Sequence, residues 1–447
     1  MKKGILLAAA GVACCCGAYA QNELDKYTTS ANTYTEIGTS MHGLSNPQDL
    51  DFVPGRPNEC WVVNRESAGG SFVLFFNTGK PNQSHQFRRD SHNGHFMART
   101  VAVAFGDNNN FATAQDIQTT NGPGTFFMGP ALWTSDTSIF ARENQDLSGS
   151  LLGSHIDMLH QSPYGMGVAY DNANVYWYFD GHNGNICKYD FAAPHIVGGD
   201  DHSDGKVYRY TDVTVTRKPN VPSHMALDKQ NNWLYIVDGG ANRVIRMKTN
   251  SGNVGSDLTP YAEPLAEFKE VTGATTEVMV SSGLSSPCGI DYRNGRIIVS
   301  DFATGNIHVY DVSTTPATLV GTILTGGPGV MGVKITNENK IWYVNSTTKK
   351  LYRIDNPNVV SVEEAVEKMN YAVYPNPANN ILNIRMDDVT GADQATIRVF
   401  DVAGRQVYTN VTGQQLTTIN TAAWAKGMYN VVLSYKNATE VTKVIVQ

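Results

Sequence analysis

One pattern of short strands and turns recurs six times between about residues 44 and 355, and it constrains the fold more than any other feature of the chain. Each copy has a short strand after a Pro or Gly, a second strand that ends in Asp or Asn, a small-residue turn, and a third strand. The clearest copy reads VPSHMALD at 221–228, WLYIVD at 233–238 and RVIRM at 243–247. Other copies begin near residues 46, 98, 162, 286 and 327. Such units predict an all-β fold in which neighbouring sheets cover one another.

The economical arrangement for six such units is a ring of sheets around a channel, which is a six-bladed β-propeller. The pattern resembles NHL repeats, and this resemblance implies the same six-bladed fold. Only three strands are evident in the last copy, so we expect residues 33–37 to supply its fourth strand and close the ring. The alternatives that the pattern leaves open are a solenoid and two stacked sandwiches.

Composition narrows the class of protein. The 447 residues carry a net charge of -7 with acidic and basic residues mixed, so nucleic acid is not an expected partner. Three cysteines remain after the N-terminal segment, Cys60, Cys187 and Cys288, and their odd number and wide spacing predict buried thiols rather than a disulfide framework.

The N-terminus has the zones of a secretory signal peptide. Lys2 and Lys3 precede an apolar run at 5–12, and the small residues at 18–20 predict cleavage before Gln21. The apolar run is too short for a stable membrane span, so we expect no transmembrane segment after cleavage. Cys14 also permits a lipoprotein signal, although Gly11 stands where such a signal has Leu.

The C-terminal residues predict a separate small Ig-like β-sandwich at 371–447, which follows the propeller at 21–356 and a linker at 357–370. Its ordered motifs are YPNPANNILNI at 374–384, IRVFDVAGRQVY at 397–408 and WAKGMYNVVL at 424–433. These motifs resemble the type A C-terminal sorting domain of the type IX secretion system of Bacteroidota. The resemblance implies recognition by the type IX machinery, passage across the outer membrane, and release or attachment at the cell surface.

Three histidines are candidates for a metal site because they stand at corresponding places in the repeat. His95, His160 and His224 precede or begin the first strands of three copies, and the loops before first strands converge at one channel mouth. Three neutral imidazoles at one point would suit zinc or copper with one open coordination position. The alternative is that each is a hydrogen-bonded structural histidine.

The stretch VPSHMAL at 221–227 resembles a ligand-bearing strand of the peptidyl-hydroxyglycine lyase propellers. This resemblance implies a histidine-bound zinc at the channel, with Tyr164 as a candidate base. The other active-site residues of that family have no counterpart here, so lyase chemistry is only one interpretation.

Two further groups of polar residues stand in loops. Asp200, Asp201 and Asp204, close to His195 and His202, suit a calcium-binding turn, and the alternative is a polar surface loop. The segment 154–160 holds two imidazoles and a carboxylate, which either join the site of His224 or satisfy their own backbone.

The sequence therefore predicts a secreted or surface-attached propeller, with two functions open. The first is binding of a peptide, glycan or protein ligand at the channel mouth. The second is a metal-dependent enzyme, lyase-like or hydrolytic, that uses the channel histidines. Fold alone does not decide between them.

Overall fold

The computed structural model describes residues 22–29, 31–119, 126–261, 263–360, 370–387, 389, 394–402, 404–435 and 438–447. The predicted signal peptide at 1–20, and residues 361–369 of the predicted linker, lie outside the described residues. The chain divides into two compact units, Met1–Val360 and Ser361–Gln447. Each unit is described by itself.

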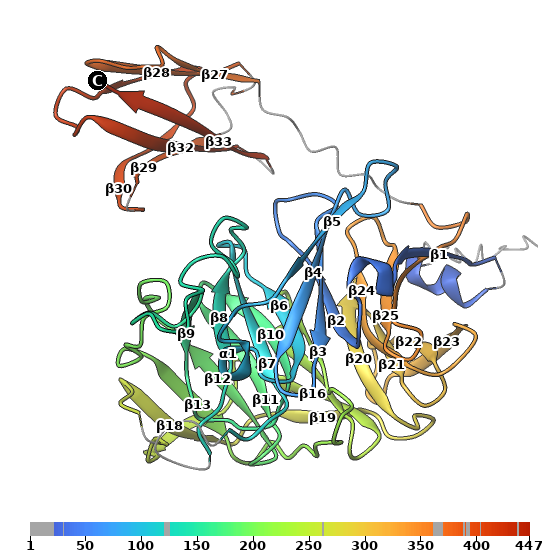
Figure 1. The fold of residues 1–447 in the computed structure, drawn as a ribbon. Coiled ribbons are helices and arrows are strands. Elements are labelled where there is room, and N and C mark those ends of the chain that lie inside the picture. Colours follow the sequence, from blue (N-terminus) through green and yellow to red (C-terminus); the bar gives the residue numbers. More distant parts are fainter. Residues whose placement is uncertain are drawn as a thin grey trace, which may run out of the picture. The chain divides into compact units, whose positions relative to one another are not determined.

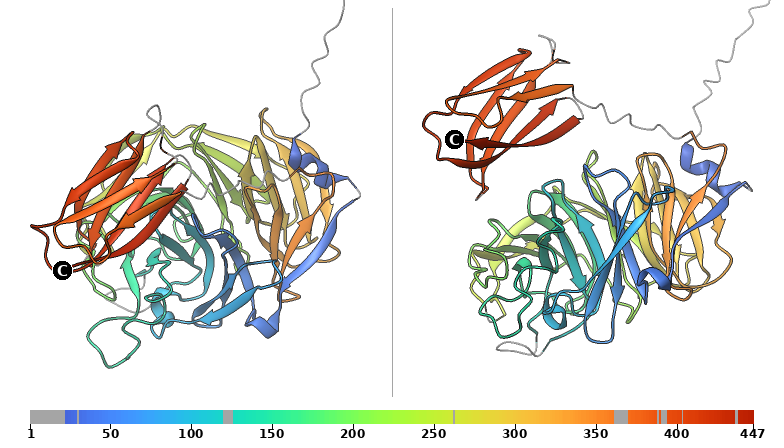
Figure 2. Two further views of the ribbon diagram at one scale, coloured as in Figure 1. Left: turned by 90° about the horizontal axis from the view of Figure 1, so that it is seen from above. Right: turned by 45° about the horizontal axis from the view of Figure 1, so that its top comes forward.

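The first unit consists of six antiparallel-based sheets arranged around a central axis (Figures 1 and 2). The first sheet contains β2 (Pro47–Phe52), β3 (Cys60–Arg65), β4 (Gly70–Phe76) and β5 (Ser84–Arg88). The second contains β6 (Thr100–Phe105), β7 (Asn110–Gln115), β8 (Ala131–Thr134) and β9 (His155–Met158). The third contains β10 (Gly165–Asn172), β11 (Val175–Asp180), β12 (Asn185–Asp190) and β13 (Lys206–Tyr210), and it is extended by β18 (Glu267–Thr272) and β17 (Asn253–Asp257).

The remaining sheets complete the ring. The fourth contains β14 (Met225–Asp228), β15 (Trp233–Asp238), β16 (Arg243–Lys248) and β19 (Thr276–Val280). The fifth contains β20 (Pro287–Arg293), β21 (Arg296–Asp301), β22 (Asn306–Asp311) and β23 (Thr318–Leu324). The sixth contains β24 (Val330–Ile335), β25 (Ile341–Asn345), β26 (Lys350–Asp355) and β1 (Thr33–Gly38). Three short helices, η1 (Glu23–Thr28), η2 (Ser40–His42) and α1 (Asn93–Phe96), stand outside the sheets.

The ring is closed, and the fold is the six-bladed β-propeller that the repeat predicted. The first strands of neighbouring blades pack against one another, from β2 against β6 round to β24 against β2. Strand β1 pairs antiparallel with β26, with Thr33 opposite Asp355, so N-terminal and C-terminal strands share the sixth blade. Closure leaves no blade with an uncovered face.

Aspartates of the first strands tie neighbouring blades together. The Asp49 carboxylate accepts the Val103 N–H at 3.0 Å, and Asp51 accepts the Phe105 N–H at 3.0 Å. Asp291 does the same between the fifth and sixth blades, with the Ile335 N–H at 2.7 Å. These hydrogen bonds satisfy backbone donors that face the channel, where no further strand can pair with them.

The aspartates that end the second strands of the third and fifth blades have a local structural role. Asp180 accepts the N–H groups of His182 and Asn183, and Asp301 accepts those of Ala303 and Thr304. A carboxylate that satisfies two donors of a tight turn fixes the hairpin to the third strand. This is why the turn signal recurs with the repeat.

The aromatic residues of the repeats are mostly core. Trp61, Trp133 and Trp177 are fully buried between blades, whereas Trp233 is half-buried with the Arg246 guanidinium 4.2 Å above its ring. The thiols of Cys60, Cys187 and Cys288 are buried and free, which confirms the expectation of unpaired cysteines.

The second unit is a β-sandwich. One sheet has β27 (Tyr371–Tyr374), β28 (Ile381–Met386) and β31 (Leu416–Asn420), and the other has β30 (Gln406–Thr412), β29 (Ala395–Asp401), β32 (Gly427–Tyr435) and β33 (Ala438–Val446). Alternate residues of both sheets form one core, including Leu382, Ile384, Ile397 and Val431. The predicted small sandwich is thus confirmed.

Among the described residues, no helix has the length and apolar character needed to cross a bilayer.

Candidate metal centre

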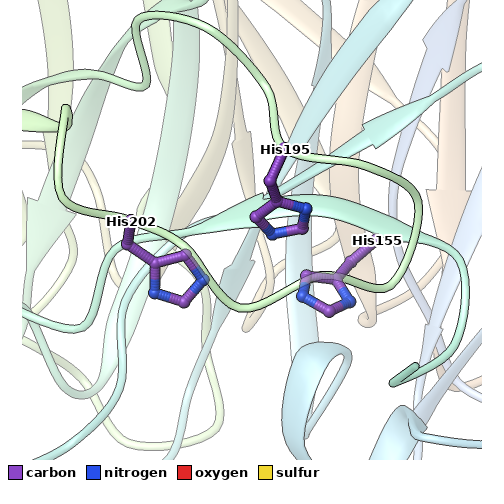
Figure 3. A group of neighbouring side chains, drawn as sticks. All are labelled: His155, His195 and His202. Atoms are coloured by element: carbon purple, nitrogen blue, oxygen red, sulfur yellow. The ribbon is translucent and has the colours of Figure 1, made fainter. Parts of the chain in front are cut away.

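Three histidines from two blades meet at the outer part of the ring (Figure 3). His155 begins β9, the last strand of the second blade, and His195 and His202 lie in the connection between β12 and β13 of the third blade. One nitrogen of each imidazole lies within 4.8 Å of one nitrogen of the other two. The backbone holds the connection in place, because the His195 N–H donates to the Ile156 carbonyl at 3.0 Å.

The Nδ1 atom of each imidazole is already engaged by an acceptor. His155 Nδ1 lies 2.8 Å from the Leu152 carbonyl oxygen and His195 Nδ1 lies 2.7 Å from that of Ile196. His202 Nδ1 lies 3.3 Å from Oε2 of Glu263. A carbonyl oxygen or a carboxylate only accepts, so each contact places the imidazole proton on Nδ1.

In the neutral form of each ring the remaining nitrogen, Nε2, is therefore the atom with the free lone pair. Each of these Nε2 atoms is buried and has no hydrogen-bond partner within the described part of the chain. Buried polar atoms are nearly always paired, so three unpaired lone pairs in one place require an explanation. A metal cation satisfies all three at once, and the proton on Nδ1 bound to an acceptor is the arrangement that metal-ligating histidines commonly show.

Glu263 supports this group from behind. Its side chain is 5% exposed, and its Oε2 accepts His160 Nδ1 at 2.8 Å in addition to His202. Its Oε1 accepts the His160 N–H and the Gln161 amide at 2.6 and 2.7 Å. A second group of converging ligand atoms consists of His160, His202 and Glu263. In this group the Nδ1 atoms of both histidines are already hydrogen-bonded to Oε2 of Glu263.

Burial and charge act on these groups in opposite directions. Burial raises the pKa of Glu263, but the hydrogen bonds from His160 and His202 outweigh it and hold that pKa at about 2. Burial lowers the pKa of His155 well below its usual value and also lowers that of His195. The two rings are thus neutral at physiological pH and able to bind a metal. For His202, burial lowers the pKa, yet the bond to Glu263 and the charge of Asp157 raise it overall.

Asp157 lies on the same face of β9 as His155, two residues away. Its Oδ1 accepts the Met158 N–H at 2.7 Å, while Oδ2 is buried without a partner among the described residues. Burial raises the pKa of Asp157 to about 8. A fourth buried polar group, mostly protonated at neutral pH, therefore lies two residues from His155 on β9.

The structure brings two of the three predicted channel histidines together and holds the third elsewhere. His95 Nε2 lies 3.0 Å from His160 Nε2, so His95 is joined through His160 to Glu263. His224 instead has Nε2 2.9 Å from the Val101 carbonyl oxygen and Nδ1 3.5 Å from Asp49. Among the described residues, the ring nitrogens of His95, His160 and His224 do not converge closely enough to bind one metal ion.

The aspartates proposed for calcium do not converge either. Asp201 accepts the N–H and hydroxyl of Ser203, Asp204 accepts the Ala193 N–H, and Asp200 is exposed. None of them belongs to a group of converging ligand atoms among the described residues. Tyr164 has φ 57°, and the Arg217 guanidinium lies 4.3 Å from the centre of its ring.

The sequence indicates both parts of the centre separately, with His155 near Asp157 and His160, and with His195 and His202 beside the three aspartates. It carries no signal for Glu263, which stands in the connection between β17 and β18. Strand β18 leaves the fourth blade and pairs parallel with β13 of the third, and this pairing brings Glu263 to His202.

Comparison with known families decides the nature of the second unit. Residues 372–447 match the family described as secretion system C-terminal sorting domain. The protein carries a sorting domain. This domain is recognised by the type IX secretion machinery, and it places the protein outside the cell, secreted or on the outer surface. The assignment of the propeller repeat to the NHL family stays a prediction.

Solved structures similar to the chain are distant. PorZ, a surface component of the type IX secretion system of Porphyromonas gingivalis, has 14% identity and a TM-score of 0.39, with 90% of this chain and 59% of PorZ covered. An auxiliary nutrient binding protein of Bacteroides thetaiotaomicron has 10% identity and a TM-score of 0.47, with 73% and 77% covered. A luciferin-regenerating enzyme has 12% identity and a TM-score of 0.45, with 74% and 97% covered. The chain thus spans less than two thirds of PorZ. No curated protein gives a significant sequence match.

Proposed function

We propose that this secreted propeller is a metalloprotein that binds one Zn²⁺ through Nε2 of His155, His195 and His202. The observation that carries the proposal is the convergence of three buried Nε2 lone pairs with no donor among the described residues. Their Nδ1 atoms are fixed by two carbonyl oxygens and by Glu263, so the rings are oriented before any metal binds.

The donor set favours zinc among the common ions. Imidazole nitrogens suit Zn²⁺ and Cu²⁺, whereas Ca²⁺ and Mg²⁺ prefer oxygen ligands. Ligand atoms of a tetrahedral zinc with bonds of about 2.1 Å lie about 3.4 Å apart. The three nitrogens lie within 4.8 Å of one another, so metal binding has to draw them closer together. Copper is the alternative ion.

Three protein ligands leave one coordination position for water or for a ligand. A metal in such a site supplies Lewis acidity and lowers the pKa of a bound water. Oδ2 of Asp157 is buried without a partner among the described residues and belongs to a carboxyl whose raised pKa keeps it mostly protonated at neutral pH, and the half-buried His195 forms the part of the site nearest solvent. The open coordination position supports the interpretation as a metal-dependent enzyme over a purely structural metal site, in which a fourth protein ligand would close the coordination.

The test is metal analysis of the full-length protein. After saturation with ZnSO4 and dialysis without chelator, we expect about one equivalent of zinc by elemental analysis. Replacement by Co²⁺ should give the strong visible absorption of a tetrahedral site. A wild-type protein that retains less than 0.1 equivalent, about background, would refute the proposal.

Glu263→Gln is expected to weaken zinc binding by about 10–100-fold, measured by competition with a chromophoric chelator. Glu263 uses both carboxylate oxygens to accept four donors, whereas the amide of Gln offers one oxygen and an NH2 group that would face one pair of these donors, so the orientation of the two imidazoles is disturbed. The matched control is Glu267→Gln, four residues away, where the carboxylate pairs with Lys206 and Tyr208. Equal affinity of the Glu263 variant and wild type would show that Glu263 does not orient a ligand.

The channel offers the second candidate, binding of a peptide, glycan or protein. At the end of the channel where the first strands begin, His224 of the fourth blade contacts Val101 of the second blade and Asp49 of the first blade. The opposite end holds a cavity of about 140 Å³, lined in part by Asp51, Asp291 and Lys334. The cavity has room for a small polar group rather than a chain segment, so ligand binding at the channel mouth stays a prediction.

A further inference from the structure

A second surface of the propeller, apart from the histidine centre, has the features of a docking groove for an anionic chain. A hollow of about 720 Å³ lies along β5 and the segment after β8. It is lined by Gln86, Phe87, Arg88, Arg89, Ala141, Arg142 and Gln145.

The positive charge of this groove is incompletely neutralised. Arg88 is 7% exposed, and its guanidinium bonds only to the neutral Gln86 side chain and the Thr137 carbonyl oxygen. No hydrogen bond or ion pair joins the exposed Arg142 guanidinium to a described residue. Only Arg89 has a carboxylate partner, Glu66 at 2.6 Å.

The two unneutralised arginines also repel each other. Burial lowers the pKa of Arg88, and the charge of Arg142 lowers it further. A buried cation without a counter-ion is costly, and a like charge nearby adds to that cost. An anion between the two guanidinium groups would remove both penalties. In a chain of net charge -7, this local excess of positive charge is a distinct feature.

The hollow runs along the open edge of a strand. β5 is the outermost strand of the first blade and pairs only with β4 among the described strands. Successive side chains of a strand point to opposite faces, yet Gln86, Phe87 and Arg88 all line the hollow. The hollow therefore follows the edge of the strand, where N–H and C=O groups face outward and where an added strand would pair.

We infer that this groove binds an extended acidic peptide of a partner protein, which adds to the first blade as a strand beside β5. The main chain of the peptide pairs with β5, its carboxylates meet Arg88 and Arg142, and an apolar side chain packs on Phe87, which is 46% exposed. An acidic glycan would use the arginines but not the strand edge.

The test uses the full-length protein and a fluorescein-labelled peptide of eight residues with alternating Glu and Val. Fluorescence anisotropy at low salt should show saturable binding that Arg142→Glu weakens by at least about tenfold. Lys80→Glu is the matched control, because Lys80 is exposed in the turn between β4 and β5 outside the groove, and it should change affinity by less than about twofold. Circular dichroism checks that both variants fold.

A second probe separates strand pairing from simple charge attraction. The same peptide with alternate backbone nitrogens methylated keeps its charge but loses its ladder donors, and it should bind at least about tenfold more weakly. The inference is overturned if wild type does not bind the peptide, or if methylation has no effect. It is also overturned if polygalacturonate binds more tightly than the peptide, a result that would assign the groove to an acidic glycan.

Discussion

Replacement of His202 by alanine should reduce the zinc affinity of the full-length protein by at least about a hundredfold, more than the loss of a hydrogen-bond partner of a ligand. His202 supplies one of the three converging Nε2 atoms and is also the ring that connects the centre to Glu263. The remaining pair of imidazoles would hold the metal with two protein ligands. Chelator competition measures the affinity, and the visible spectrum of the Co²⁺ form should lose its tetrahedral bands.

The matched control for this variant is His182→Ala, because His182 is an exposed histidine outside the group. It should keep wild-type affinity. His195→Ala tests the same site from a half-buried position, so a defect caused by misfolding of the His202 variant would not be repeated there. Wild-type affinity in both ligand variants, with correct circular dichroism, would place the metal elsewhere.

Replacement of Trp61 by alanine should lower the free energy of unfolding by about 3–5 kcal/mol. The fully buried indole lies against Phe105 and Phe111 of the second blade and Phe140, with ring centroids 5.1–5.3 Å apart. Its N–H also donates to Glu59 at 2.7 Å, and the variant would leave this mostly buried carboxylate without that partner. Urea unfolding of the full-length protein, followed by circular dichroism, measures the change in the propeller transition.

Trp233→Ala is the control, since it removes the same atoms from a half-buried position. There the ring packs under Arg246 and Lys248, at 4.2 and 4.4 Å, and such contacts contribute about 0.5–1 kcal/mol each near the surface. We therefore expect a smaller loss, of about 1–2 kcal/mol. Equal losses for the two variants would contradict the view that the interface between the first two blades is the more tightly packed.

The two candidate surfaces differ in what they require of the secreted protein. The histidine centre contains residues of the second and third blades. Glu263 comes from the segment before β18, a strand that leaves the fourth blade and pairs with the third, so the centre depends on the assembled ring. The arginine groove lies along the edge of one blade and the segment that follows β8. A variant in one surface should leave the other unchanged, because the two share no lining residue.

The fold could be predicted from the sequence because its signals are local and periodic. The blades repeat one pattern of short strands and turns, with aspartate turns such as those of Asp180 and Asp301, and the sorting domain carries three ordered motifs. A structural repeat that is complete within about forty residues can be recognised in the sequence without knowledge of distant contacts. The contact between His95 and His160 was also expected, because loops before first strands occupy equivalent places in the ring, whereas a metal site at His95, His160 and His224 stays a prediction.

The candidate site, by contrast, was decided by tertiary structure. The sequence by itself determined the repeat, the ring, the sandwich and the export signal at the C-terminus. It could not show that His155 on an outer strand meets His195 and His202 from the next blade, because side-chain convergence between blades leaves no periodic trace. Nor could it show that β18 crosses to the third blade and carries Glu263 to His202. Parallel pairing between strands distant in sequence depends on which edges remain open once the blades have formed, and only the folded ring fixes those edges.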